Sequence, residues 1–370
     1  MKSADLEPQF QGILRALFKD VPFMSLASLK ADAKLPNGKG ARADWLGELR
    51  AGDETWTLIA EAKRNGQPRE VRSAALQVKD YLSRLPDTKP GCGLVLAPFI
   101  SEQSAQICKE AGIGYADLAG NAFLSFGKVF VERRVAGNAG SVKREAKSIF
   151  SPKATRVIRV LLQGPLRAWK VKELAKAAEV SLGHVSAVRQ KLLGREWAVE
   201  NEDGLRLSQP DALLDAWAAE DDFSKRTQIR EYSTLAADYT LAGNLIAFCG
   251  SHNSLSDKDP LFTLNFAAWL RAPHNVPTIV SAYLDRFPDE DELLPFLQAR
   301  PVSRGAGNLR IIVPSDFKAL TIDKQKVIKF PDFSLVSDLQ LFLDLHGGEP
   351  NGPEQARVLR DLEDFNGGWS

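Results

Sequence analysis

The chain has 370 residues, of which 44% are hydrophobic and 26% are charged, and its net charge is +1. These values are typical of a folded globular protein of two or three domains, and no apolar run approaches the ~20 residues of a membrane span. The three cysteines are scattered, and the opening MKSADLEPQF lacks the apolar stretch of a signal peptide. We therefore expect a cytoplasmic protein without disulfides or membrane association.

The charge is distributed unevenly along the chain. Residues 1–141 carry 19 basic and 16 acidic side chains, residues 142–195 carry 13 and 3, and residues 196–370 carry 16 and 28. A net charge of +10 over the middle segment is typical of a nucleic-acid contact, so double-stranded DNA is the expected partner. The acidic remainder is expected to face away from the phosphate backbone.

Within residues 1–141, the helical spacing of apolar residues predicts a first helix over residues 6–18. Two apolar-rich segments, residues 43–50 and 55–63, then flank Gly52-Asp53, which suits a two-residue hairpin turn. In that hairpin, paired residue numbers sum to 105, so Asp44 faces Glu61. The period of two along a strand puts Lys63 on the same face as Glu61.

Two opposed carboxylates repel each other, so this hairpin predicts a cation between Asp44 and Glu61. Hard oxygen ligands of this kind suit Mg²⁺ or Mn²⁺, bound with water and substrate phosphate. The ammonium of Lys63 would orient or help deprotonate a water molecule and offset phosphate charge. The alternative is a solvated hairpin edge with no chemistry.

A helix over residues 68–85, begun by a proline, follows the hairpin and carries Gln77 and Tyr81 on one face. Asp117 is expected to cap a turn rather than to join the site. The remaining elements of this segment are a helix from Ser101 that ends at Gly112, and strands at residues 93–98, 113–118, 122–126 and 129–133.

Asp44 with Glu61-Ala62-Lys63 resembles the PD-(D/E)xK nuclease pattern, although Ala43 stands where that family usually has proline. The sequence Gln77-Val78-Lys79-Asp80-Tyr81 resembles the Gln-x-x-x-Tyr element of RecB-like members of that superfamily. The resemblance implies a restriction-endonuclease-like α/β sandwich over residues 1–141. It also implies that Asp44 and Glu61 hold the metal, that Lys63 is catalytic, and that Gln77 and Tyr81 brace the site or the phosphate.

Residues 142–220 are predicted to form a winged helix-turn-helix. Helices are expected at residues 154–162, 171–178 and 182–193, the last capped by Ser181, with two short strands around the turn at residues 201–204. The acidic turn departs from the usual basic wing, and a protein-binding helix trio is the alternative. Residues expected to enter the major groove are Ser181, Gly183, His184, Ser186, Arg189 and Gln190; those expected on phosphates are Lys170, Lys172, Lys191 and Arg195.

Residues 221–370 are predicted to form an acidic α/β domain that serves packing or binds a protein partner. We expect strands at residues 277–282 and 309–314, and helices at residues 261–270, 290–298, 335–345 and 353–365. The polar stretch 249–260, with Asp257 and Asp259, is interpreted as a loop. The two Leu-Ala-Gly-Asn segments, at residues 118–121 and 241–244, are interpreted as unrelated tight turns.

The segments YADLAGNAFLSF (115–126), VSDLQLFLDL (336–345) and residues 234–247 resemble bacterial AbiEi-like antitoxin and regulator proteins. That resemblance implies a nucleotidyltransferase-like C-terminal domain, here degenerate, because the order and spacing of Gly250-Ser251 and Asp257/Asp259 are typical of a polar loop rather than of a transferase site. Two functions stay open: Mg²⁺-dependent hydrolysis of DNA targeted by the winged helix, and a non-catalytic transcriptional regulator or antitoxin of the AbiEi-like type. The sequence also leaves open whether the chain forms an oligomer.

Overall fold

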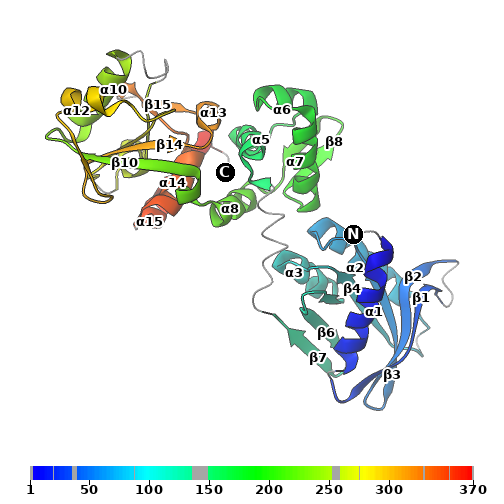
Figure 1. Ribbon diagram of the computed structural model, residues 1–370. Helices are drawn as coiled ribbons and strands as arrows, with labels where there is room; N and C mark the ends of the chain where they lie inside the picture. Colours follow the sequence, from blue (N-terminus) through cyan, green and yellow to red (C-terminus); the bar gives the residue numbers. More distant parts are fainter. Residues whose placement is uncertain are drawn as a thin grey trace. The chain divides into compact units, whose positions relative to one another are not determined.

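The computed structural model describes residues 3–19, 21–35, 40–86, 88–135, 149–251, 259–274, 276–327, 330–349 and 351–368 (Figure 1). Asp257, which the sequence suggested as part of a polar loop, lies outside these residues. The chain is a mixed α/β protein that divides into two compact units, Met1–Ala146 with Lys191–Glu196, and Lys147–Gln190 with Trp197–Ser370. Among the described residues, no helix is both long and apolar enough to cross a membrane.

The first unit is built on a seven-stranded sheet whose strands lie in sequence order, β1 to β7. The pairs β3–β4 and β4–β5 are parallel and the other neighbours are antiparallel. Helices α2 and α3 connect the parallel strands. The elements are α1 (Ser3–Lys19), β1 (Met24–Lys34), β2 (Arg42–Ala51), β3 (Glu54–Ala62), α2 (Pro68–Ser83), β4 (Gly91–Ala97), α3 (Glu102–Ala111), β5 (Gly114–Asp117), β6 (Ala122–Phe126) and β7 (Val129–Arg133).

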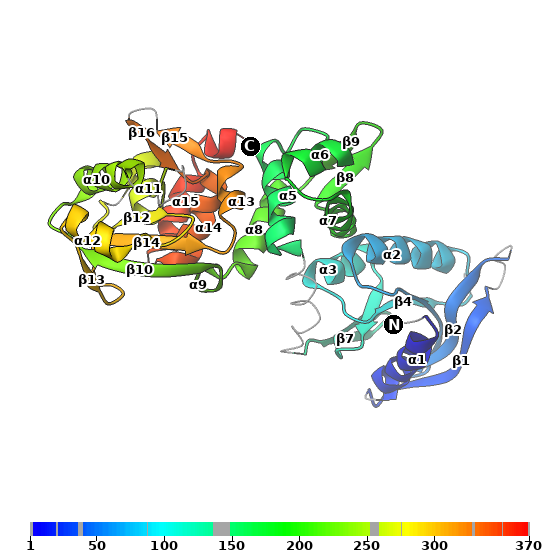
Figure 2. The same ribbon diagram turned by 45° about the horizontal axis from the view of Figure 1, so that its top comes forward.

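Helices cover both faces of this sheet, as Figure 2 shows. Successive side chains of a strand point to opposite faces, and the central strand β4 uses both. Leu94 and Leu96 pack in the core that contains α1, whereas Val95 and Ala97 pack in the core that contains α2 and α3. All four are fully buried. The α/β layering expected from the sequence is therefore present in this unit.

The hairpin β2–β3 has the register predicted from its turn. The ladder runs from Ala51 opposite Glu54 to Trp45 opposite Ala60, so the paired numbers sum to 105. Gly52 adopts φ +60°, the left-handed conformation that this position of the turn requires. Because turn and ladder agree, the ends of β2 and β3 that carry Asp44 and Glu61 lie side by side.

The second unit begins with three helices and a short hairpin. The helices are α5 (Pro152–Gln163), α6 (Val171–Ala177) and α7 (Leu182–Gly194), and the hairpin is β8 (Ala198–Asn201) with β9 (Gly204–Leu207). Each was predicted within a few residues. Ser181 accepts a hydrogen bond from the His184 amide, as expected of the residue that begins α7. Between α6 and α7, Glu179 adopts φ +51°.

The rest of this unit is a second seven-stranded sheet with the order β13-β10-β14-β12-β11-β16-β15. Its most buried helix is α14, whose residues from Asp338 to Leu345 are all buried. The elements are α8 (Pro210–Glu220), α9 (Phe223–Arg226), β10 (Thr227–Ser233), α10 (Asp238–Ser251), β11 (Leu261–Thr263), α11 (Leu264–Arg271), β12 (Val280–Tyr283), α12 (Glu290–Leu297), β13 (Arg300–Val302), β14 (Leu309–Pro314), α13 (Phe317–Thr321), β15 (Gln325–Val327), β16 (Phe330–Leu335), α14 (Asp338–Gly348), α15 (Gly352–Arg360) and the 3₁₀ turn Phe365–Gly367.

Three predictions for this region were wrong. The first three residues of the helix expected at residues 261–270 form strand β11 instead, because all three pair with β12 and the first two also pair with β16. The helix expected from residue 335 begins at Asp338, since Leu335 ends β16. The segment 241–244 is not a turn, because it lies inside α10, where Leu241, Ala242 and Leu245 are buried.

Candidate active site

Just past the last pair of the β2–β3 ladder, the Glu61 carboxylate contacts the main chain of Asp44, and the Asp44 carboxylate contacts the main chain of Ala62. The Asp44 amide donates to Oε1 of Glu61 at 3.3 Å, and the Ala62 amide donates to Oδ2 of Asp44 at 2.8 Å. The two carboxylates thus satisfy the amides that follow the ladder. This reciprocal arrangement holds both acids at the same end of the hairpin.

Lys63 completes this cluster. Its Nζ lies 3.5 Å from Oε2 of Glu61, and its amide donates to the carbonyl of Leu96 in β4, which fixes the main chain at this point. Glu61 is only 3% exposed. The pKa of its carboxyl is raised to about 7, first by burial and then by the charge of Asp44, while Lys63 acts to lower it. Glu61 therefore titrates near neutral pH, as catalytic and metal-binding carboxylates often do.

A pocket of about 270 Å³ lies directly beside the cluster. It is bounded by α1, by the strands β1 and β2, and by the residues that end β3, and part of it is open to solvent. Its lining is apolar on the side of α1 and charged on the side of the sheet. The lining residues are Leu6, Glu7, Phe10, Asp32, Asp44, Trp45, Ala62, Lys63 and Arg64. A phosphate placed there would meet the cations of Lys63 and Arg64.

Gln77 and Tyr81 brace the strand that carries Asp44. Nε2 of Gln77 donates to the Tyr81 hydroxyl at 2.7 Å, and that hydroxyl donates to the carbonyl of Arg42 at 3.0 Å. Arg42 lies two residues before Asp44 and also forms an ion pair with Asp32 of β1. The structure therefore places the expected Gln-x-x-x-Tyr pair on the β2 main chain. The Asp32–Arg42 pair could not be predicted, because it depends on the pairing of β1 with β2.

The donor set at this site fits a hard divalent cation. Mg²⁺ is commonly held by one or two carboxylates together with water and phosphate oxygens, and Asp44 and Glu61 supply two carboxylates. The negative charge of Asp44 helps to raise the pKa of Glu61. A cation between the two acids would offset the repulsion between their charges. Within the described part of the chain, no group of three or more His, Cys, Asp or Glu residues has a metal-binding arrangement. Two carboxylates are therefore the protein's contribution.

Asp117 has the structural role that the sequence favoured. Its Oδ1 accepts from the amides of Ala119 and Asn121, and its Oδ2 accepts from the Ile100 amide and from the Asn121 side chain, all at 2.9 Å. The side chain is fully buried. Both oxygens are occupied, so Asp117 holds the β5–β6 turn and the start of α3.

The residues expected to contact DNA differ in their surroundings. Ser181, Gly183, His184, Ser186 and Gln190 of the α7 region are exposed, as are Lys170 and Lys172. The Ser181 hydroxyl lies 2.8 Å from Nδ1 of His184, and Lys170 donates to the carbonyl of Glu202. Arg189, the expected base reader, forms an ion pair with Glu200 of β8, with Nε at 2.7 Å from Oε1. Lys191 and Arg195 lie at the C-terminal end of the same helical segment.

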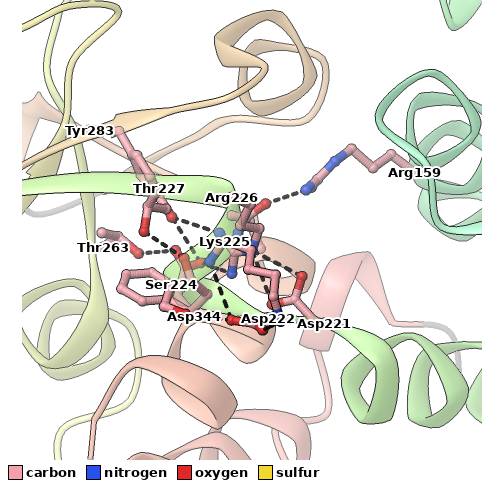
Figure 3. Close-up of polar contacts among 12 residues, drawn as sticks. Arg159, Asp221, Asp222, Ser224, Lys225, Arg226, Thr227, Thr263, Tyr283 and Asp344 are labelled. Atoms are coloured by element: carbon pink, nitrogen blue, oxygen red, sulfur yellow. Dashed lines mark hydrogen bonds and ion pairs between the residues drawn. The ribbon is translucent and has the colours of Figure 1, made fainter. Parts of the chain in front are cut away.

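A second concentration of buried polar groups surrounds Asp344 of α14 (Figure 3). The Asp344 carboxylate accepts hydrogen bonds from Arg226 at 2.6 Å, Tyr283 at 3.0 Å and Gln340 at 2.5 Å, and also from Thr263. The sequence analysis missed this cluster, because its members lie up to 118 residues apart. Since both carboxylate oxygens are occupied by protein groups, we interpret it as a structural anchor that joins α9, β11 and β12 to α14.

Comparison with known proteins leaves the family open. No family model matches the chain, and no curated protein matches it. Among solved structures, a repair endonuclease from Pyrococcus abyssi is similar to part of the chain, with 14% sequence identity and a TM-score of 0.24. The similar region covers 32% of this chain and 47% of the endonuclease chain. A structural similarity this low does not assign a function, so the proposed function rests on the residues of the site.

Proposed function

We propose that the first unit is a PD-(D/E)xK-type nuclease domain that hydrolyses DNA phosphodiesters with Mg²⁺ or Mn²⁺. One observation carries the proposal. Two carboxylates and an ammonium, from Asp44, Glu61 and Lys63, lie together at the end of a hairpin, where Asp44 and Lys63 line an open pocket. A solvated hairpin edge accounts less well for Glu61, which is buried and whose pKa is raised to about 7.

Each residue of the cluster has a separate role in this proposal. Asp44 and Glu61 hold the cation, which when bound polarises the scissile phosphate and a water molecule. The ammonium of Lys63 is placed to orient water and to offset phosphate charge. Tyr81, supported by Gln77, keeps β2 in position through the carbonyl of Arg42. These two residues are therefore positioning residues rather than ligands.

In the second unit, α5–α7 and the β8–β9 hairpin form the proposed DNA-binding winged helix. Residues 142–195 carry 13 basic and 3 acidic side chains. The polar side chains of His184, Ser186 and Gln190 are exposed along α7, whereas Val185 and Val188 are buried. Such a helix can enter the major groove while exposed lysines contact phosphates.

A second candidate function is a non-catalytic DNA-binding regulator or antitoxin, similar to the AbiEi-like proteins. The observation in its favour is that α5 of the helix trio is joined to α14 and to the residues on either side of α13 by ion pairs and a hydrogen bond. Arg156 pairs with Asp316 at 2.7 Å, and Arg159, which is 3% exposed, pairs with Asp323 at 3.3 Å and bonds Gln340. Such a junction suits a module that responds to a protein partner on the acidic C-terminal domain.

Cation binding separates the two candidates. Calorimetric titration of the full chain with Mn²⁺ should show binding that Asp44→Asn and Glu61→Gln each abolish, while Asp53→Asn at the opposite end of the hairpin keeps it. Binding of a random-sequence duplex should be unchanged in all three variants. If wild type binds duplex but no Mn²⁺, the regulator is the better account.

A further inference from the structure

Arg189 of α7 and Glu200 of β8 form a two-point ion pair. Nε of Arg189 donates to Oε1 of Glu200 at 2.7 Å, and Nη2 donates to Oε2. The side chains keep 25% and 30% of their exposure, so the pair lies at the surface. Both views place β8 beside α7 (Figures 1 and 2). The pair therefore joins the proposed recognition helix to the first strand of the proposed wing.

Glu200 occupies the hydrogen-bonding groups that Arg189 would use on DNA. The planar guanidinium presents two parallel N–H donors, which fit a carboxylate, a phosphate, or O6 and N7 of guanine. Arg189 must therefore exchange acceptors before it contacts DNA.

The two exchanges that DNA offers differ in electrostatic cost. Exchange for a phosphate leaves the released carboxylate of Glu200 beside an anionic backbone. Exchange for a guanine edge restores both hydrogen bonds and adds no anion next to Glu200. The pair therefore penalises phosphate contacts more than guanine contacts.

The rest of the hairpin strengthens this asymmetry. Its turn carries Glu202 and Asp203, and the only charge of opposite sign on its two strands is Arg206 of β9. The carbonyl of Glu202 accepts from Lys170, which ties the turn to the residue that precedes α6. An acidic hairpin is repelled by phosphates, so its contribution to DNA binding must come through another residue.

We propose that Glu200 is a specificity-determining residue that withholds Arg189 from phosphates and releases it to a guanine edge. The acidic hairpin thereby suppresses binding to unrelated DNA. This inference rests on the proposed DNA-binding function of the helix trio. An acidic wing of this kind limits binding to unrelated DNA, whereas a basic wing would bind phosphates.

The test compares two charge-neutral variants of the hairpin, Glu200→Gln and Glu202→Gln, in the full chain. Affinity is measured by fluorescence anisotropy on a random-sequence duplex pool and on the duplex that wild type enriches most from that pool. Glu200→Gln should tighten binding to the pool about tenfold and binding to the enriched duplex much less. The ratio of the affinity for the enriched duplex to the affinity for the pool therefore falls. The slope of log affinity against log salt on the pool should steepen by about one unit, because Arg189 gains a phosphate. Glu200→Asp should keep the wild-type ratio.

Four results would overturn the inference. Equal shifts in Glu200→Gln and Glu202→Gln would mean that only the net charge of the hairpin matters. Weaker binding of Glu200→Gln to both DNAs would mean that Glu200 supports Arg189 rather than restrains it. An effect of Glu200→Gln that persists in the Arg189→Ala background would exclude the pair as its cause. Failure of wild type to enrich any duplex from a pool that it binds would remove the specificity itself.

The proposed function fails in a different way. A wild-type chain that binds neither DNA would refute DNA binding by the helix trio, and with it this inference. A wild-type chain that binds and enriches DNA, together with an unchanged ratio in Glu200→Gln, refutes only the role of Glu200.

Discussion

The carboxylate of Asp44 accepts a hydrogen bond from the strand that carries Glu61, and Glu61 accepts one from the Asp44 amide. The contact closes the β2–β3 hairpin at the end opposite its turn. It also brings two acids together in a place where one of them is buried, and the cost is visible in the pKa of Glu61, which is raised to about 7. The hairpin therefore holds these two acids in place through hydrogen bonds to its own main chain.

The first prediction concerns stability and pH. The folded pKa of Glu61, about 7, is higher than the ordinary value of 4.5. The neutral carboxyl therefore stabilises the fold fully below pH 4.5, and this contribution is lost as the pH rises through 7. Glu61→Gln stays neutral, so without metal at pH 8 its free energy of unfolding should exceed that of wild type by about 1–3 kcal/mol.

This prediction is measured by urea unfolding in EDTA at pH 5 and pH 8, with hydrogen exchange in peptides from β2 and β3 as the probe of the first unit. Glu48→Gln, on the exposed side of β2, is the matched control and should follow wild type at both pH values. If Glu61→Gln and wild type differ in their free energy of unfolding by the same amount at pH 5 and pH 8, Glu61 is not protonated in the folded protein.

The second prediction concerns the brace on β2. Tyr81→Phe removes the hydroxyl that bonds both Arg42 and Gln77, and should destabilise the first unit by about 1–2 kcal/mol. Gln77→Leu should cost less, because Tyr81 keeps its bond to the Arg42 carbonyl. If the proposed cleavage occurs, both variants should lower kcat more than they raise KM, since they displace Asp44 without touching substrate. Equal unfolding midpoints for Tyr81→Phe and wild type would rule the brace out.

The third prediction concerns Glu179, which adopts φ +51° between α6 and α7. A residue with a Cβ atom is disfavoured in this left-handed conformation, whereas glycine adopts it readily. Glu179→Gly should stabilise the second unit by about 1 kcal/mol, with little offset from the exposed pair with Lys318 at 3.9 Å. Lys176→Gly, inside α6, should destabilise it by about 1 kcal/mol. Thermal unfolding, measured by calorimetry, compares both variants with wild type. A melting temperature of Glu179→Gly below that of wild type contradicts the account.

The fourth prediction separates affinity from base recognition. Lys172→Ala should weaken binding to every duplex alike and reduce the salt slope by about one unit, because it removes a phosphate contact. Arg189→Ala should cost about 1–3 kcal/mol on the enriched duplex and relax the choice of base there. Anisotropy titrations at several salt concentrations measure both. If Arg189→Ala weakens enriched and scrambled duplexes equally, α7 does not read bases.

The register of the β2–β3 hairpin could be predicted because a two-residue turn fixes every later pair. Once Gly52 and Asp53 were recognised as the turn, the positions of Asp44 and Glu61 followed by counting. The helices α2, α3, α5 and α7 could also be predicted, since each combines an apolar period with a cap or a leading proline. In these places local signals and the fold agree.

Strand β1 could not be predicted, because its sequence MSLASLKADAK has no clear apolar alternation. It lies at the edge of the sheet, and most of its side chains are exposed or half-buried, so its hydrogen bonds to β2 define it. Strand β11 was misread for a related reason. Its apolar run continues into α11, and only pairing with β12 and β16 separates the two.

Contacts between distant residues were beyond the reach of the sequence. Arg226 and Asp344 are 118 residues apart, and no pattern in the sequence pairs them. Arg189 was expected to read bases, but its pairing with Glu200 was not foreseen, because the pair depends on how the hairpin packs on α7. Both cases involve polar groups whose partners are chosen by tertiary structure.

Cleavage of a supercoiled plasmid in Mg²⁺ or Mn²⁺ tests the central claim most directly. Wild type and the control Lys89→Ala, on an exposed loop, should nick or linearise the plasmid and should stop when EDTA is added. Asp44→Asn, Glu61→Gln and Lys63→Ala should leave the plasmid intact while still shifting it in a gel, because residues 142–195, with 13 basic and 3 acidic side chains, keep their net charge of +10. Cleavage by Glu61→Gln at the wild-type rate, or a wild-type chain that binds the plasmid and cuts it with neither metal, would contradict the assignment of Asp44, Glu61 and Lys63 as a nuclease site.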